Sequence, residues 1–426
     1  MIARLAVRTL WRNRNRYKLL FLAIFFGFSL VVLLLGVSSG ALAAIKQKAS
    51  RYFAGQITIR GYRNGSAYIE NPDELVAILK TGKFPFSTIS KRSIYYHTNA
   101  AIYYGGESVR QRRLVGVNFE EELKEFSTLP FLEGSAEAML KDKRGILISK
   151  SASKILGAHV GDAVLLYLTT NEGQANTAEL IVQGIFNETS LFGYAAYVNY
   201  AMLNELVNLS AGSATDIAIY FPKGISENML IKYLHGFLAE HYPVLPLVGR
   251  KDLTEKLSKD KRPYVLTVIS LDANLDTIKD LLDALTIILY LLFAVFLLVI
   301  MTGIMNTYRV ILFERTVEIG TMRALGIQRN QVLTMFLLEA FFLAAVSALC
   351  GFIAGTGLLF VISKLSLKNI PGAGLFTNNG FLMLFLKPSY VMIGFILLTA
   401  AVLLAVQGPA RRASLLSPAE ALREII

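Results

Sequence analysis

The segment from Phe313 to Val332 concentrates charged side chains and glycines whose chemistry could serve the docking of another protein. It reads FERTVEIGTMRALGIQRNQV and stands between two apolar runs, each of which is long enough to cross a bilayer. Gly320 permits a change of direction, Thr321 to Leu325 can form one helical turn, and Gly326 suits the left-handed residue that ends such a turn. We therefore expect a small knob with apolar and charged residues. The alternative is an ordinary connecting loop, but such a loop need not be this apolar.

Residues that could catalyse a reaction or bind a metal form no recognisable motif. The histidines stand in no metal-ligand spacing, and no G-x-S-x-G or paired-carboxylate signature accompanies them. We interpret all four as structural: His97, His159, His235 and His241. The acidic run Glu120, Glu121, Glu122 and Glu125 is interpreted as the solvated face of a short helix. No G-x-x-x-x-G-K-[ST] motif is present, so the sequence predicts no metal, no cofactor and no ATP bound through a Walker motif in this chain.

The elements that must position the knob are membrane-spanning helices. Of the 426 residues, 54% are hydrophobic and only 17% charged, and the mean hydropathy is +0.49. About 20 apolar residues in a helix cross a bilayer, and four runs qualify. We predict an integral membrane α-helical protein with transmembrane helices at residues 19–45, 284–308, 332–363 and 388–410. Between the first two lies a large extracytoplasmic domain at residues 46–283.

The positive-inside rule orients this arrangement. Six basic residues and no acid lie in residues 1–18, so we expect a cytoplasmic N-terminal arm. Residues 309–331 then form a cytoplasmic coupling element, residues 364–387 an outer loop and residues 411–426 a cytoplasmic tail. The first span is longer than the apolar part of a signal peptide, which favours an uncleaved anchor. The net charge of +12 predicts no nucleic-acid partner, because about half of it lies in the arm and anionic lipids explain it.

The outer domain is predicted to be α+β, because alternating strand-like runs are interleaved with helical ones. The strand-like runs include GQITIRG, RLVGV, GILIS, DAVLLYLT and TDIAIYF. Helices are expected over Pro72 to Lys80 and over Ser149 to Leu156, with Gly157 ending the second. The sole cysteine, Cys350, falls in the third span, so no disulfide can support this domain.

Small residues at four-residue spacing indicate close helix packing. They form one face of the first span and one face of the third: Gly36, Gly40, Ser347, Gly351 and Gly355. These faces could pack on each other or on a second subunit. No charged relay crosses the spans, which argues against an ion-coupled carrier, and Glu339 is expected to pair with a cytoplasmic arginine or to lie at the interface. Helical stalks are expected at both ends of the outer domain, over Ala41 to Ala54 and Leu271 to Leu285.

Several longer stretches resemble the FtsX-like permease family of ABC transporters, of the MacB and LolC/LolE kind. They are ERTVEIGTMRALGIQRNQV followed by FLLEAFFLAAVSALCGFIAG, the ending PARRASLLSPAEALREI, and the outer-domain segments LVGVNFEEELKEFSTLPFLEG and GILISKSASKILGAHVGDAVLLYL. The resemblance covers nearly the whole chain. It implies a permease subunit that does no chemistry itself and couples ATP hydrolysis by a separate cytoplasmic ATPase dimer to movement of the outer domain, the type VII or mechanotransmission arrangement.

The resemblance also implies the site and the partners. The residues expected to contact the ATPase are Glu314, Arg315, Glu318, Ile319, Gly320, Met322, Arg323, Ala324, Leu325 and Gly326. The chain starts about 18 residues before its first span, which favours the LolC/LolE layout over the MacB layout with its fused ATPase. The expected setting is a bacterial inner membrane, with a second permease subunit, membrane lipids, a lipoprotein or other amphipathic client and a possible periplasmic chaperone or adaptor. The alternatives are MacB-like efflux with an adaptor and FtsX-like signalling to a cell-wall hydrolase.

Overall fold

The computed structural model describes residues 8–12, 14–96, 99–111, 113–170, 172–187, 196–222, 224–247, 249–367, 370 and 372–415. The chain divides into two compact units. The helical unit comprises Met1–Leu42, Leu282–Ser366 and Phe381–Ile426. The α+β unit comprises Ala43–Leu281 and Leu367–Gly380.

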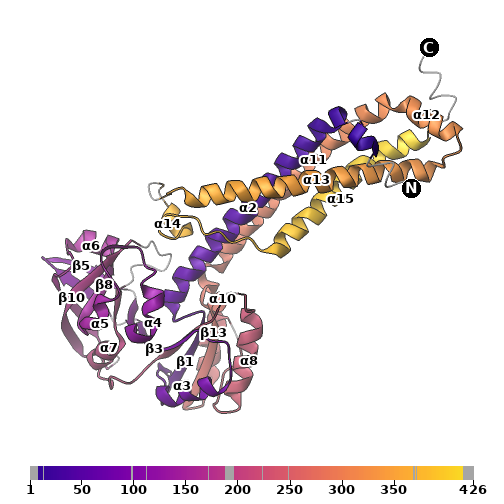
Figure 1. Cartoon of the computed structure of the whole chain (residues 1–426). Helices are drawn as coiled ribbons and strands as arrows, with labels where there is room; N and C mark the ends of the chain where they lie inside the picture. The colour runs from indigo at the N-terminus through magenta and orange to yellow at the C-terminus, as the bar shows by residue number, and fades with distance from the viewer. Residues whose placement is uncertain are drawn as a thin grey trace. The chain divides into compact units, whose positions relative to one another are not determined.

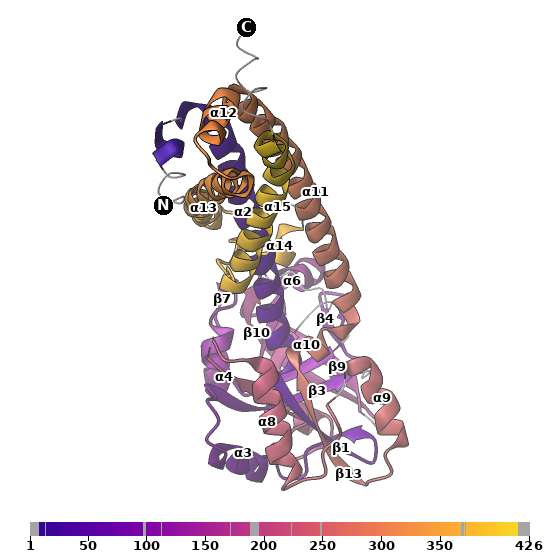
Figure 2. The same ribbon diagram turned by 90° about the vertical axis from the view of Figure 1, so that its right-hand side faces the viewer.

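The helical unit is built from long helices and one short one (Figures 1 and 2). The long helices are α2 (Arg14–Phe53), α11 (Asp276–Glu314), α13 (Arg329–Lys364) and α15 (Pro388–Leu415), and the short helix α12 (Thr316–Ala324) lies at one end of this unit in both views. Four helical segments are long and apolar enough to cross a membrane: Asn15–Phe53, Thr286–Glu314, Arg329–Lys364 and Pro388–Leu415. This finding agrees with the four predicted spans in number and order.

Glycines allow α2 and α13 to approach closely. A Cβ atom on Gly351 would lie 2.6 Å from the carbonyl oxygen of Phe25, and one on Gly355 would lie 2.7 Å from that of Ser29. Gly36 meets the side chain of Leu359 on α13 in the same way. The remaining two predicted packing residues are Ser347, which is fully buried, and Gly40, which faces the backbone of Met383. The structure therefore uses these small residues for packing within the chain.

The α+β unit is organised around one mixed sheet of thirteen strands within the described residues. Its main path runs β13-β1-β12-β3-β6-β11-β8-β10-β9-β4-β5, with β2 beside β1 and β7 beside β10. Pairing is antiparallel except at β10 with β8 and at β11 with β6. The strands are β1 (Ile57–Arg63), β2 (Ser66–Ala67), β3 (Thr88–Tyr96), β4 (Ala101–Tyr104), β5 (Glu107–Arg110), β6 (Arg113–Val117), β7 (Phe131–Gly134), β8 (Gly145–Ser149), β9 (Ala163–Thr169), β10 (Ala175–Phe186), β11 (Ala196–Asn199), β12 (Asp216–Tyr220) and β13 (Tyr264–Ser270).

Short helices cover this sheet and form separate apolar cores with it. One core lies between β1, β12 and β13 and the helices α3 (Pro72–Thr81) and α8 (Glu227–Ala239), and a second lies between β8 to β11 and the helices α6 (Lys150–Leu156) and α7 (Tyr200–Leu206). A third joins the end of α2 to α4 (Phe119–Phe126), α5 (Ala138–Lys141) and α10 (Leu271–Asn274). The remaining helices of the unit are α9 (Arg250–Lys259) and α14 (Ala373–Phe376).

Local turn chemistry accounts for the elements that were predicted correctly. All five strand-like runs are strands, and α6 begins after Ser149, whose side chain accepts a hydrogen bond from the backbone N–H of Ala152. Gly157 ends α6 with a φ of +69°, as expected for a left-handed cap. The single helix expected over Leu271 to Leu285 was wrong, because α10 and α11 are separate helices with Leu275 between them.

Candidate functional site

The chain bends at Arg315, between the end of α11 at Glu314 and the start of α12 at Thr316. Arg315 has φ −102° and ψ 8°, which lies outside the helical range. Gly320 is buried inside the continuous helix α12, so the expectation that the chain changes direction at Gly320 was wrong. A glycine permits a bend but does not require one, whereas the side chain of Arg315 is held by bonds that fix its position.

Arg315 is the centre of a buried polar cluster that connects the corner between α11 and α12 to α2 and α13. Its Nη1 donates to Oε2 of Glu339 on α13 at 2.8 Å and to the hydroxyl of Tyr17 on α2 at 3.1 Å. The Tyr17 hydroxyl in turn donates to Oε2 of Glu339 at 2.9 Å. All three residues are at most 2% exposed. The expectation that Glu339 pairs with an arginine is confirmed, and the pair fixes the corner between α11 and α12 against α2 and α13.

Two further contacts of the Arg315 guanidinium complete its environment. Its Nε donates to Oε2 of the half-exposed Glu318 at 3.0 Å, and its carbon Cζ lies 5.0 Å from the centre of the Phe336 ring. Burial alone lowers the pKa of Arg315, but attraction to the Glu339 carboxylate outweighs it and holds the pKa above its ordinary value. The arginine therefore stays charged. The second oxygen of Glu339, Oε1, is buried without a hydrogen-bond partner among the described residues.

The predicted coupling residues divide according to their exposure. Arg315, Ile319 and Gly320 are buried, and Met322 and Arg323 are partly buried. Glu314, Glu318, Ala324, Leu325 and Gly326 are exposed. Leu325 is 85% exposed, and it shares an exposed face with Val317, Thr321 and Ala324 at helical spacing. In this conformation Arg315, Ile319 and Gly320 offer almost no surface to another protein, and contact with one depends on the other predicted residues.

A Schellman motif fixes the end of α12. Gly326 has φ +94°, its N–H donates to the carbonyl oxygen of Arg323, and the N–H of Ile327 donates to that of Met322. Met322 and Ile327 both pack against the core of the helical unit. This motif gives α12 a fixed C-terminus and holds Leu325 outward, as the sequence prediction for Gly326 required.

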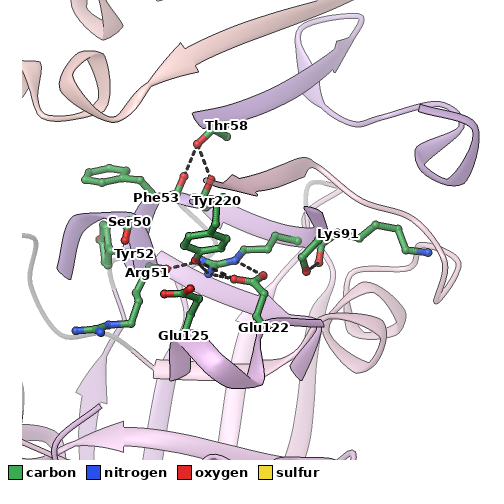
Figure 3. Close-up of polar contacts among 12 residues, drawn as sticks. Ser50, Arg51, Tyr52, Phe53, Thr58, Lys91, Glu122, Glu125 and Tyr220 are labelled. Atoms are coloured by element: carbon green, nitrogen blue, oxygen red, sulfur yellow. Dashed lines mark hydrogen bonds and ion pairs between the residues drawn. The ribbon is translucent and has the colours of Figure 1, made fainter. Parts of the chain in front are cut away.

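A second polar cluster, in the α+β unit, caps the C-terminus of α2 (Figure 3). The last four carbonyl groups of a helix have no partner within it. In α2 the carbonyl of Ser50 accepts from the N–H of Gly55 and that of Phe53 accepts from the hydroxyl of Thr58 at 2.7 Å. The carbonyls of Arg51 and Tyr52 accept from the guanidinium groups of Arg92 and Arg113, the latter at 2.8 Å. All four carbonyls are thus occupied, and two positive charges lie at the negative end of the helix.

These two arginines are themselves held by partners in the α+β unit. Arg92 Nε donates to Oε1 of Glu122 at 2.8 Å, and its Nη2 donates to the hydroxyl of Tyr220 at 2.9 Å. Arg113 lies over the rings of Tyr52 and Phe53, at 4.4 and 4.8 Å from their centres. The interpretation of Glu122 as solvated was therefore wrong, since Glu122 is fully buried and paired. Burial lowers the pKa of Arg92, and the Glu122 carboxylate more than compensates for it.

Sequence reasoning missed Tyr17, Arg92, Arg113 and Glu122. One local signal was available: Arg92 and Arg113 lie within strand-like runs, where a charged side chain facing a sheet needs a partner. The partners themselves are distant along the chain. No group of three or more histidine, cysteine or acidic side chains that could hold a metal ion is found within the described residues. His97 lies outside those residues.

Sequence profiles of known protein families match stretches of both units. A sequence profile described as the MacB-like periplasmic core domain matches residues 19–234, and one described as the FtsX-like permease C-terminal domain matches residues 290–418. This chain belongs to the FtsX-like permease family. The first profile spans the end of α2 with its arginine caps, and the second spans the α12 corner and the helices beside it.

Individual related proteins are similar to this chain over different lengths. LolC of the lipoprotein-releasing system of Haemophilus influenzae is 22% identical over 78% of this chain and 77% of its own length. An uncharacterized ABC transporter permease of Methanocaldococcus jannaschii is 28% identical over 41% of each chain. The macrolide export protein MacB of Vibrio parahaemolyticus is 33% identical over 35% of this chain, which spans 21% of that protein. A solved extracellular domain of the transporter YknZ from Gram-positive bacteria aligns with 49% of this chain at 16% identity and a TM-score of 0.30.

Proposed function

We propose that this permease is a subunit of a bacterial mechanotransmission ABC transporter of the inner membrane. A separate cytoplasmic ATPase dimer would dock on the exposed face of α12, and a second permease, either another copy or a paralogue, would complete the transporter. The work done would be extraction of lipoproteins or other amphipathic clients from the membrane. The α12 corner would face the cytoplasm and the α+β unit would be extracytoplasmic.

The single observation that supports this proposal is the corner at Arg315 between α11 and α12, which we call the α12 corner. It is found here in a chain of the FtsX-like permease family. Its buried half, Arg315 with Glu339 and Tyr17, anchors α12 to α2 and α13. Its exposed half presents Leu325 and Val317 together with the carboxylate of Glu318. An exposed apolar face rimmed by charge is typical of a protein-docking site. A force applied to this face would therefore reach two of the long helices directly.

The choice of a lipoprotein or another amphipathic client rests on the likeness to LolC, which extends along most of both chains. A second candidate is efflux with a periplasmic adaptor, which is favoured by the match of residues 19–234 to the MacB-like domain. Release of a lipid-modified protein from the membrane in the presence of ATP would support extraction over efflux. Capture of an adaptor without such release would favour efflux.

The proposed docking is tested by the rate of ATP hydrolysis of a cognate ABC ATPase, measured with the purified chain reconstituted in nanodiscs. We expect the wild-type chain to stimulate ATP hydrolysis. Leu325→Asp should reduce the stimulation at least about tenfold, because an unpaired carboxylate in an apolar contact costs more than about 1.4 kcal/mol.

Leu132→Asp is the matched control, since Leu132 is also an exposed leucine but lies on β7 of the α+β unit. It should leave the ATPase rate unchanged. If the ATPase hydrolyses ATP no faster with the wild-type chain than without it, the proposed coupling is refuted. If Leu325→Asp removes the chain from the membrane, Leu325 serves folding and not docking.

A further inference from the structure

An apolar pocket in the helical unit adjoins the buried Arg315 cluster. It has a volume of about 520 Å³, within the range of pockets that hold small molecules. Its lining includes Leu10, Trp11, Tyr17, Lys18, Phe342 and Val346, from the N-terminal segment, α2 and α13. Lys18 is the one charged residue among the described residues of the lining. The pocket therefore offers an apolar volume with a single cation.

The cations in and near this pocket differ in whether they have an acidic partner in the described part of the chain. Arg16 is paired, with its Nε 3.3 Å from Oε2 of Glu314. Arg12 and Lys18 are exposed, and neither forms an ion pair with a described residue. Arg12 directly follows Trp11, which is 79% exposed. Unpaired cations and a tryptophan next to an apolar helical segment are typical of the level of lipid headgroups.

We propose that this pocket binds one acyl chain of an anionic phospholipid, with the headgroup phosphate at Lys18. The apolar lining suits a hydrocarbon chain and disfavours a water-soluble ligand. The unpaired cations distinguish an anionic lipid from a zwitterionic one, because each basic residue near an anionic headgroup adds attraction. The inference rests on the membrane location proposed above but not on the ATPase partner.

Tyr17 gives this lipid a structural consequence. Its side chain lines the pocket, while its hydroxyl contacts both Arg315 and Glu339. A lipid chain packed against Tyr17 favours the position in which these bonds form. Anionic lipid should therefore raise the melting temperature of the chain by stabilising the corner between α11 and α12.

The sole tryptophan of the sequence makes the pocket directly observable. The full chain is placed in nanodiscs of phosphatidylcholine that contain a small fraction of phosphatidylglycerol with brominated acyl chains, which quench tryptophan fluorescence on contact. We expect saturable quenching of Trp11, competed by unlabelled phosphatidylglycerol and stronger than with brominated phosphatidylcholine. Lys18→Gln should lower the preference for the anionic lipid about fivefold, the loss expected for one basic residue.

Val346→Phe places a ring in the pocket where the acyl chain would lie, and it should reduce the quenching by phosphatidylglycerol toward the level of phosphatidylcholine. It should also abolish the rise in melting temperature. Val361→Phe is its control, because Val361 is exposed on α13 outside the pocket, and Lys364→Gln is the control for Lys18→Gln.

Equal quenching by both lipids in the wild-type chain would overturn the proposal, since it would show an unselective lipid-facing groove. Quenching by a brominated diacyl lipopeptide but not by the phospholipid would also overturn it, and would assign the pocket to a client. Neither result depends on ATP hydrolysis, so the failure of this inference is distinguishable from failure of the proposed coupling.

Discussion

At the scale of single residues, both polar clusters depend on a buried arginine that faces a buried carboxylate. Arg315 and Arg92 are at most 2% exposed, and their partners Glu339 and Glu122 are fully buried. Removing two charges from water costs several kcal/mol for each ion, which the contact between them must offset. Such a pair adds little net stability but makes the loss of either partner costly. It therefore specifies one position for the helices that carry it.

Replacing Arg315 alone should lower the free energy of unfolding more than replacing both Arg315 and Glu339. Arg315→Met leaves Glu339 buried and unpaired, at a cost of about 3 to 5 kcal/mol, whereas Arg315→Met with Glu339→Met removes the uncompensated charge and should recover most of this loss. Thermal unfolding of the four variants in detergent closes the double-mutant cycle. The exposed pair Lys259 and Glu255 is the control, because Lys259→Met should cost under about 1 kcal/mol. Additive losses for Arg315 and Glu339 would contradict the argument.

The burial of these residues could not be predicted from their neighbours along the chain. Arg315 stands next to Glu314 and near Glu318, a pattern typical of an exposed helix. Its partners Glu339 and Tyr17 lie 24 and 298 positions away. Glu122 similarly stands in an acidic run, and its partner Arg92 lies on a strand 30 positions earlier. Gly326 and Gly157 were predicted correctly because a left-handed cap depends only on local backbone geometry.

At the scale of elements, α2 and α13 lie so close together that a residue with a Cβ atom would not fit at the contact without a shift of its neighbours. Gly355 faces the carbonyl oxygen of Ser29 and the side chain of Val32, both within 3 Å of where a Cβ would lie. Two residues further along the same helix, Gly357 has no atom within 4 Å of that position. The two glycines therefore share a helix and a residue type but differ in packing.

This difference yields a matched pair of variants. Gly355→Val should force α2 and α13 apart at a cost of about 1 to 3 kcal/mol, the range for overpacking. Gly357→Val should leave the melting temperature of the purified chain close to that of the wild type. Equal losses in the two variants would show that glycine matters here for backbone reasons and not for helix contact.

At the scale of the whole molecule, two helices, α2 and α11, have residues in both units. Helix α2 runs from Arg14 to Phe53, with residues up to Leu42 in the helical unit and residues from Ala43 in the α+β unit. The Arg315 cluster binds Tyr17 near one end of α2, and Arg92 and Arg113 bind the carbonyls at the other. The spans and the α+β class could be predicted from hydropathy and strand periodicity. The anchoring of α2 could not, because it depends on residues from distant strands.

If α2 transmits the force of ATP hydrolysis, weaker hydrogen bonds to its C-terminal carbonyls should lower the amount of client released per ATP. Arg113→Lys removes the planar guanidinium that donates to Tyr52 and stacks on its ring, a change of about 1 to 3 kcal/mol. We expect ATP hydrolysis to continue while the amount of client released per ATP falls. Arg110→Lys, at an exposed position on β5, is the control. A parallel fall in hydrolysis and release would mean that Arg113 affects folding or assembly instead.

The occupied carbonyls at the end of α2 also limit the kinds of motion that this helix can make. A helix of 40 residues is about 60 Å long at 1.5 Å per residue. Adding or removing a turn at its C-terminus would break the bonds to Gly55, Arg92, Arg113 and Thr58 together. As long as these bonds hold, α2 can neither gain nor lose a turn at its C-terminus.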